Sequence, residues 1–163
     1  MTIRQFLLFR LSAAVLATLF CGNTALAAAT SDYSSNLATL YGEYQRVLAV
    51  RDACLTLQPG RRELLSEAYQ DWFARHVRII DDLDNRFAAI VKRASKDQAD
   101  YSRNYGKYQS EVYQMRDENK KTLLAERDKL ANQCDEFPAY LRHPKSDIPA
   151  LFPAAFKGIY RPR

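Results

Sequence analysis

Two cysteines near the ends of helix-like segments constrain most strongly how this chain can fold. Cys54 stands just before a Pro59-Gly60 break, and Cys134 lies near the end of a later segment with helical periodicity. A disulfide within one chain would close a loop of about 80 residues, worth roughly 4–5 kcal/mol in the chain-entropy model. Residues 55–133 could then not form one straight rod, so the chain would have to double back.

The first 27 residues have the pattern of a secretory signal peptide. Arg4 and Arg10 flank the start, an apolar run covers residues 11–21, and Ala25-Leu26-Ala27 places small residues at the −3 and −1 positions. We expect cleavage after Ala27, with Ala29 as the alternative. The mature protein is then periplasmic or secreted.

Two other interpretations of the leader are weaker. A retained membrane anchor would need a longer apolar run than this Ala-rich stretch provides. Attachment of a lipid to Cys21 would need a small residue before it, where the chain has Phe20. We therefore expect no stable membrane insertion after the leader is removed.

Export bears directly on the two remaining cysteines. In an oxidising compartment, a pair of cysteines is usually bridged. A bridge between two chains and a reactive thiol are the alternatives to an intramolecular Cys54–Cys134 disulfide. The sequence has no CxxC motif and no nearby base that would activate a thiol, which disfavours the reactive thiol.

Three segments, residues 31–57, 61–94 and 97–136, carry apolar residues at helical steps of three and four. The first has Ser31 or Asp32 as an N-cap. The second is the most regular, and its stripe consists of Tyr69, Phe73, His76, Ile80, Leu83, Phe87, Ile90 and Ala94.

The junction between the second and third segments contains neither Gly nor Pro. Ser95 followed by Gln98 fits a capping box and suggests a break near residues 95–97. Strand signals are nearly absent. The sequence therefore predicts an all-α domain over residues 28–141, an up-down-up bundle of three long helices.

Residues 142–163 form a basic C-terminal tail with four prolines. Because repeated proline forbids a long helix, we expect an extended tail. It either folds back along the bundle or docks on a partner. Its candidate binding residues are Arg142, Lys145, Phe152, Phe156, Lys157, Tyr160 and Arg161.

The charge and the motifs exclude several functions. Removing Arg4 and Arg10 with the leader lowers the formal net charge from +5 to +3, too little for a general nucleic-acid binder. His76 and His143 do not form an i,i+4 metal-binding pair, so His76 is expected to pack with one nitrogen hydrogen-bonded. We expect no metal, no cofactor and, without a recognisable hydrolase motif, no catalysis.

The ten tyrosines are the one compositional anomaly. Tyr101, Tyr105 and Tyr108 share a helical face, with Tyr113 nearby, and Tyr41, Tyr44 and Tyr69 could oppose them. Such tyrosines can form a packed core whose hydroxyls reach water, or a recognition face with rigid contact area and polar tips.

Together these features predict an exported, non-catalytic helical protein that binds a protein or an envelope component. The contacts would be the tyrosine face, the basic tail or both, and an oligomer is possible. An envelope-stress chaperone or metal-responsive protein is one alternative. A small lytic or redox enzyme that uses Glu67, Asp71 or Cys54 is another.

Overall fold

A computed structural model describes the backbone of residues 24–160 and the side chains of residues 32–160. The predicted leader lies outside the described residues, except for residues 24–27, which begin the first helix. Arg161 also lies outside them.

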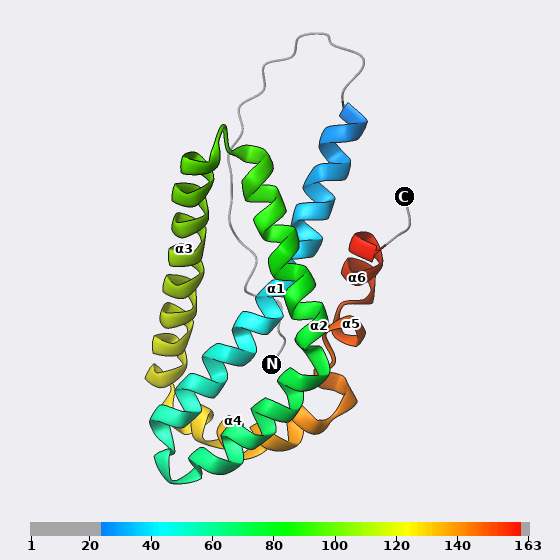
Figure 1. The fold of residues 1–163 in the computed structure, drawn as a ribbon. Coiled ribbons are helices and arrows are strands. Elements are labelled where there is room, and N and C mark those ends of the chain that lie inside the picture. Colours follow the sequence, from blue (N-terminus) through cyan, green and yellow to red (C-terminus); the bar gives the residue numbers. More distant parts are fainter. Residues whose placement is uncertain (1–23, 161–163) are drawn as a thin grey trace, which may run out of the picture.

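The described residues form helices joined by short turns, and they contain no strand (Figure 1). The all-α prediction is therefore confirmed. The α-helices are α1 (Thr24–Leu57), α2 (Arg62–Ala94), α3 (Gln98–Ala125), α4 (Arg127–Arg142), α5 (Ile148–Leu151) and α6 (Pro153–Tyr160). Single 3₁₀ turns, Pro59–Arg61 and Pro144–Ser146, precede α2 and α5.

The α2–α3 turn falls where the sequence indicates a break, but a different residue caps the new helix. The carboxylate of Asp97 accepts a hydrogen bond from the Asp100 amide at 2.8 Å, so Asp97 is the N-cap of α3. Ser95 is the C-cap of α2, and its hydroxyl donates to the Val91 carbonyl. The expected Ser95–Gln98 capping box is therefore wrong.

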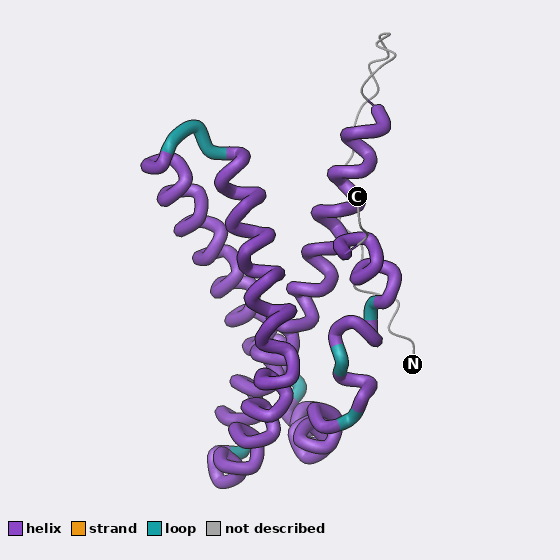
Figure 2. The backbone as a smooth tube through the Cα atoms, turned by 45° about the vertical axis from the view of Figure 1, so that its right-hand side comes forward, coloured by secondary structure: helices purple, strands orange, loops and turns teal. Residues whose placement is uncertain are grey.

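The expected bundle of three long helices differs from the described fold. The third segment divides at Glu126 into α3 and α4, because the backbone of Glu126 leaves helical geometry (φ −103°, ψ 56°). In Figure 1, α4 runs across the lower part of α1 and α2 instead of continuing the line of α3, and Figure 2 shows only helices and loops over the described residues. This turn lets α4 bury one face, Leu130, Cys134, Phe137, Pro138 and Leu141.

A disulfide joins Cys54, near the end of α1, to Cys134 in α4. Their Cα atoms are 5.4 Å apart, and both side chains are fully buried. Both cysteines belong to the buried core cluster, which also includes Val50, Ala53, Leu65, Ala68, Trp72 and Leu130 from α1, α2 and α4.

The tail is not extended, which corrects the sequence-based expectation. It forms a 3₁₀ turn, α5 and α6, and each of these begins with a proline in its first two positions. Proline has no backbone N–H, but the N–H groups of the first helical turn have no partner within the helix in any case. Pro144, Pro149 and Pro153 therefore start helices instead of preventing them. Ile148, Ala155 and Ile159 are buried, and α6 packs on α1. Of the two alternatives for the tail, the structure shows the one that folds back along the bundle.

Candidate binding site

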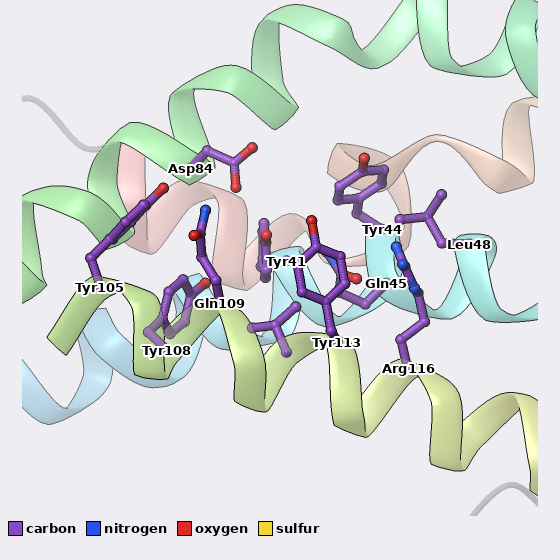
Figure 3. A pocket seen from close by; sticks show the side chains of 11 residues that line it. Tyr41, Tyr44, Gln45, Leu48, Asp84, Tyr105, Tyr108, Gln109, Tyr113 and Arg116 are labelled. Atoms are coloured by element: carbon purple, nitrogen blue, oxygen red, sulfur yellow. The ribbon is translucent and has the colours of Figure 1, made fainter. Parts of the chain in front are cut away.

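The tyrosine-rich helical face lines a cavity of about 220 Å³ between α1, α2 and α3 (Figure 3). We call this cavity the tyrosine pocket. Helix α1 supplies one wall, α3 supplies the other, and α2 contributes a single acid. The lining residues are Tyr41, Tyr44, Gln45, Leu48, Asp84, Tyr105, Tyr108, Gln109, Val112, Tyr113 and Arg116.

The inner rings of the pocket are fixed by aromatic packing. The ring of Phe87, on α2, lies 4.9 Å from the Tyr41 ring and 5.2 Å from the Tyr108 ring. Tyr105 packs beside Tyr108, with 6.1 Å between ring centroids. In Figure 3 the hydroxyl groups of Tyr105 and Tyr113 point away from α3 into the space between the helices. The rings are therefore held while polar groups face the cavity.

Two buried polar atoms at the pocket have no hydrogen-bond partner among the described residues. They are Oε1 of Gln45, a side chain that is only 4% exposed, and the hydroxyl oxygen of Tyr108. Leaving such a group unpaired costs about 1–3 kcal/mol. Buried polar groups normally have partners, so these two atoms are the unsatisfied polar groups of the pocket lining.

One acid and one base line the pocket. Asp84 comes from α2, and burial, helped by the nearby charge of Asp81, raises the pKa of Asp84, although the neighbouring Tyr41 hydroxyl acts in the opposite direction. Arg116 comes from α3, where its guanidinium lies 5.0 Å from the Tyr113 ring centroid. Its Nε is 4.0 Å from the carboxylate of Asp52. The lining of the pocket therefore contains one acidic and one basic side chain.

The hydroxyls of the inner tyrosines are neutral over the physiological pH range. Burial raises the pKa of Tyr41, and the neighbouring Tyr108 and Asp84 raise it further. Burial likewise raises the pKa of Tyr44 above its ordinary value and that of Tyr108 to about 12. Each neutral hydroxyl can both donate and accept a hydrogen bond.

The structure brings together only part of the tyrosine set that the sequence singles out. Tyr105 and Tyr108 line the pocket, opposite Tyr41 and Tyr44. Tyr101 stacks on Tyr105 at 5.6 Å but does not line the cavity. Tyr69 does not line the cavity either; it stacks on Phe73, whose ring lies 6.5 Å from that of Tyr44, and it lies beneath the guanidinium of Arg51, whose Cζ is 4.3 Å from the ring centroid.

None of the described tail residues lines the tyrosine pocket, and Phe156 and Tyr160 instead line a second cavity, of about 340 Å³, between α2 and the tail. Phe152, Phe156 and Tyr160 pack against the core, which leaves them partly buried. Arg142, Lys145 and Lys157 are exposed on the surface.

Gln45, Asp84 and Arg116 are pocket residues that the sequence reasoning missed. A signal for Gln45 is present in the sequence, because it follows Tyr41 by four residues and therefore shares its helical face. Spacing alone does not single out Asp84 and Arg116, which are charged and therefore suit an exposed helix face equally well. Their place in the pocket depends on how α2 and α3 pack against α1.

Both ring nitrogens of His76 have an acceptor within hydrogen-bond distance, where the sequence suggested a partner for one. Its Nδ1 lies 2.7 Å from the Trp72 carbonyl oxygen, and its Nε2 lies 3.0 Å from a carboxylate oxygen of Asp147. The ring also stacks on Trp72 at 4.4 Å. This histidine therefore connects α2 to the tail. Over the described residues, no three His, Cys, Asp or Glu side chains gather as a metal site would require.

Glu67 and Asp71, the carboxylates considered for a lytic enzyme, are exposed on α2 and do not line the tyrosine pocket. Within residues 24–160, no helix combines the length and apolarity needed to cross a membrane. Comparison of the chain with family models, with curated proteins and with solved structures finds no match.

Proposed function

We propose that this protein is an exported, non-catalytic helical protein that binds a protein or an envelope component through the tyrosine pocket. The observation that carries the proposal is the buried Oε1 of Gln45, which has no hydrogen-bond partner among the described residues. Gln45 lines a cavity large enough to admit part of a ligand. Pockets with a few convergent polar groups are the usual places where proteins bind ligands.

The pocket is a better candidate than the tail. The apolar side chains that made the tail suitable for docking, including Phe156 and Tyr160, already pack against the core. Phe156 and Tyr160 also line a second cavity, of about 340 Å³, but none of the described residues that line it has a buried polar atom without a partner. The tyrosine pocket has two such atoms, and Tyr113 at its rim is 59% exposed. Tyrosine is enriched where binding energy is concentrated, because it offers rigid apolar area and a polar tip.

The chemistry of the lining residues supports binding more than catalysis. Among the described residues that line the pocket, Asp84 is the only carboxylate, and neither histidine is present. General acid–base catalysis usually needs two groups of different proton affinity at the reacting bond. Neutral tyrosine hydroxyls and amides can orient a ligand but have little capacity to transfer protons near neutral pH.

Capture from a detergent-free envelope extract tests the proposal. The immobilised mature protein is compared with Tyr113→Ala, which removes an exposed ring at the rim, and with Lys157→Ala, an exposed change on α6. We expect a component that is retained by the wild type and by Lys157→Ala and is lost with Tyr113→Ala. Equal retention by all three proteins, or retention by none, would overturn the proposed site.

The export part of the proposal has its own test. Cell fractionation followed by sequencing of the mature N-terminus should place the protein outside the cytoplasm, beginning at Ala28 or, after cleavage at the alternative site, at Thr30. A cytoplasmic protein that retains its first 27 residues would contradict export. That outcome would not decide whether the pocket binds a ligand, which the capture experiment tests separately.

A further inference from the structure

We propose that the ligand of the tyrosine pocket is a neutral saccharide unit, presented by a glycan of the cell envelope. This inference rests on the proposed function, since it names the ligand class for the same pocket. It is carried by the kind of polar groups that line the cavity, by their charge balance, and by the exposed ring at the rim.

The polar groups of the pocket match those of a sugar. Five of the lining residues are tyrosines, from α1 and α3. The inner hydroxyls stay protonated, since burial holds the pKa of Tyr41, Tyr44 and Tyr108 above the ordinary value. Each can donate to one sugar hydroxyl and accept from another.

Gln45 adds a specific requirement for a donor. Its Oε1 is buried, accepts no hydrogen bond from the described residues, and belongs to a side chain that lines the pocket. A sugar hydroxyl that donates to this oxygen would satisfy it. Sites with such a buried polar group reject analogues that lack the matching hydroxyl, because the protein atom is then left unpaired.

The charges disfavour an ionic ligand. Aromatic rings beside Asp84 would suit an organic cation, but the guanidinium of Arg116 lines the same cavity and would repel it. An anion attracted by Arg116 would meet Asp84 instead. A neutral polyhydroxylated ligand encounters neither repulsion, and its hydroxyls can donate to Asp84 and accept from Arg116.

The shape of the site fits one sugar ring that belongs to a longer chain. The cavity of about 220 Å³ is smaller than the roughly 300–1,000 Å³ typical of pockets for drug-sized ligands. Tyr113 and Gln109 are exposed at the rim, so the pocket opens to solvent and a bound ring can remain attached to a glycan. The ring of Tyr113 offers an apolar face against which the C–H side of a sugar can pack.

The test uses an array of neutral and charged glycans, followed by calorimetry on the neutral glycans bound. Tyr105→Phe removes a pocket hydroxyl but keeps the ring, and Tyr101→Phe makes the same change on α3 outside the pocket. We expect Tyr105→Phe to weaken binding by about fivefold to tenfold, the value of one buried hydrogen bond, and Tyr101→Phe to leave it unchanged. Circular dichroism and the midpoint of thermal unfolding establish that both variants fold.

A second pair of variants tests the rim. Tyr113→Ala should abolish binding of the same glycan, whereas Tyr113→Phe, which keeps the ring, should retain most of it. Loss in both variants, or in neither, would contradict packing of the sugar against this ring. Because Tyr113 is exposed, these variants disturb the core little.

Three results would overturn the saccharide assignment. The first is that no neutral glycan binds and water alone fills the pocket. The second is that a neutral glycan binds Tyr105→Phe as tightly as it binds the wild type. The third is that only a charged glycan binds. If the capture experiment nevertheless yields a peptide or an organic cation that depends on Tyr113, the proposed function stands and the ligand class is wrong. If capture also fails, both proposals fail.

Discussion

Tyr160, in the last described helix, donates a hydrogen bond to the carboxylate of Asp82 on α2. The same carboxylate pairs with Arg86 at 2.6 Å, and the Arg86 guanidinium lies 4.7 Å from the Tyr160 ring centroid. These three side chains join α6 to α2. They make the tail part of the folded domain, which is why we do not place the binding site there.

Acid should weaken this attachment of the tail. Burial disfavours the charged form of Asp82, but hydrogen bonds from Tyr160 and Arg86 outweigh it and hold the pKa of Asp82 below its ordinary value of 3.8. A carboxylate whose pKa is lowered on folding stabilises the fold fully above its ordinary pKa and loses that contribution as the pH falls through the lowered value. The protection factors of residues 153–160 against hydrogen exchange, corrected for the intrinsic rate at each pH, should therefore fall below about pH 4, the ordinary range for Asp.

Tyr160→Phe provides the control for the acid experiment. It removes a hydrogen bond that lowers the pKa of Asp82, so the protection factors of residues 153–160 should be lower at neutral pH and should change less on acidification. Tyr101→Phe, the same change away from Asp82, should behave like the wild type. An acid response identical in all three proteins would contradict the role of this cluster.

Removing residues 142–163 should destabilise the whole domain. The truncation deletes Ile148 and Ile159, which are 0% and 6% exposed, and it removes the Ser146 carbonyl that accepts a hydrogen bond from Trp72 at 3.0 Å. Loss of two buried isoleucines alone should lower the free energy of unfolding by roughly 3–6 kcal/mol. Urea unfolding of the mature protein measures this, with Lys145→Ala as an exposed control. Unchanged stability after truncation would show that the tail does not belong to the core.

The Cys54–Cys134 bridge should be intramolecular and stabilising. Non-reducing mass spectrometry of monomer should recover a peptide that links the two cysteines. Replacing both with Ala should lower the free energy of unfolding by about 2–5 kcal/mol, because the unfolded chain gains a long open loop. If the linked peptide occurs only in dimers, the bridge connects two chains and the described position of α4 is wrong.

Gly106→Ala should stabilise α3 without disturbing its neighbours. A Cβ at Gly106 would meet nothing within 4 Å, so the substitution gains the roughly 0.5–1 kcal/mol by which Ala exceeds Gly inside a helix. Gly158→Ala is the matched comparison, because a Cβ there would collide with the side-chain amide of Asn36 on α1. The Gly158 variant should gain less or lose stability, as measured by thermal unfolding. A larger gain at Gly158 than at Gly106 would contradict the close packing of α6 on α1.

The parts of the fold that the sequence predicts are those encoded by local pattern. The stripe from Tyr69 to Ala94 fixes α2, and the polar residues near Ser95 mark its end. No Gly or Pro in the sequence marks the break at Glu126. The break depends instead on the packing of α4 against α1 and α2, which buries one face of α4. The tail prolines exclude one long helix but not several short ones, because proline is compatible with a first turn.

The site could be predicted less well than the fold. Spacing along α3 indicates that Tyr105 and Tyr108 share a face, and spacing along α1 places Tyr41 and Gln45 together. That these faces oppose each other across a cavity, and that Asp84 closes it, depends on the packing of three helices. Tyr101 shows the limit of the pattern, since it shares the stripe yet lies outside the pocket.

Tyrosine-selective NMR offers the most direct test of the tyrosine pocket as the binding site. The mature protein, labelled with ¹³C in its tyrosine rings, is titrated with the envelope extract used for capture. Resonances of Tyr41, Tyr44, Tyr105, Tyr108 and Tyr113 should shift, while those of Tyr33, Tyr140 and Tyr160 should stay in place. Shifts confined to Tyr140 and Tyr160, with the five pocket tyrosines unchanged, would contradict the assignment and place binding elsewhere on the molecule.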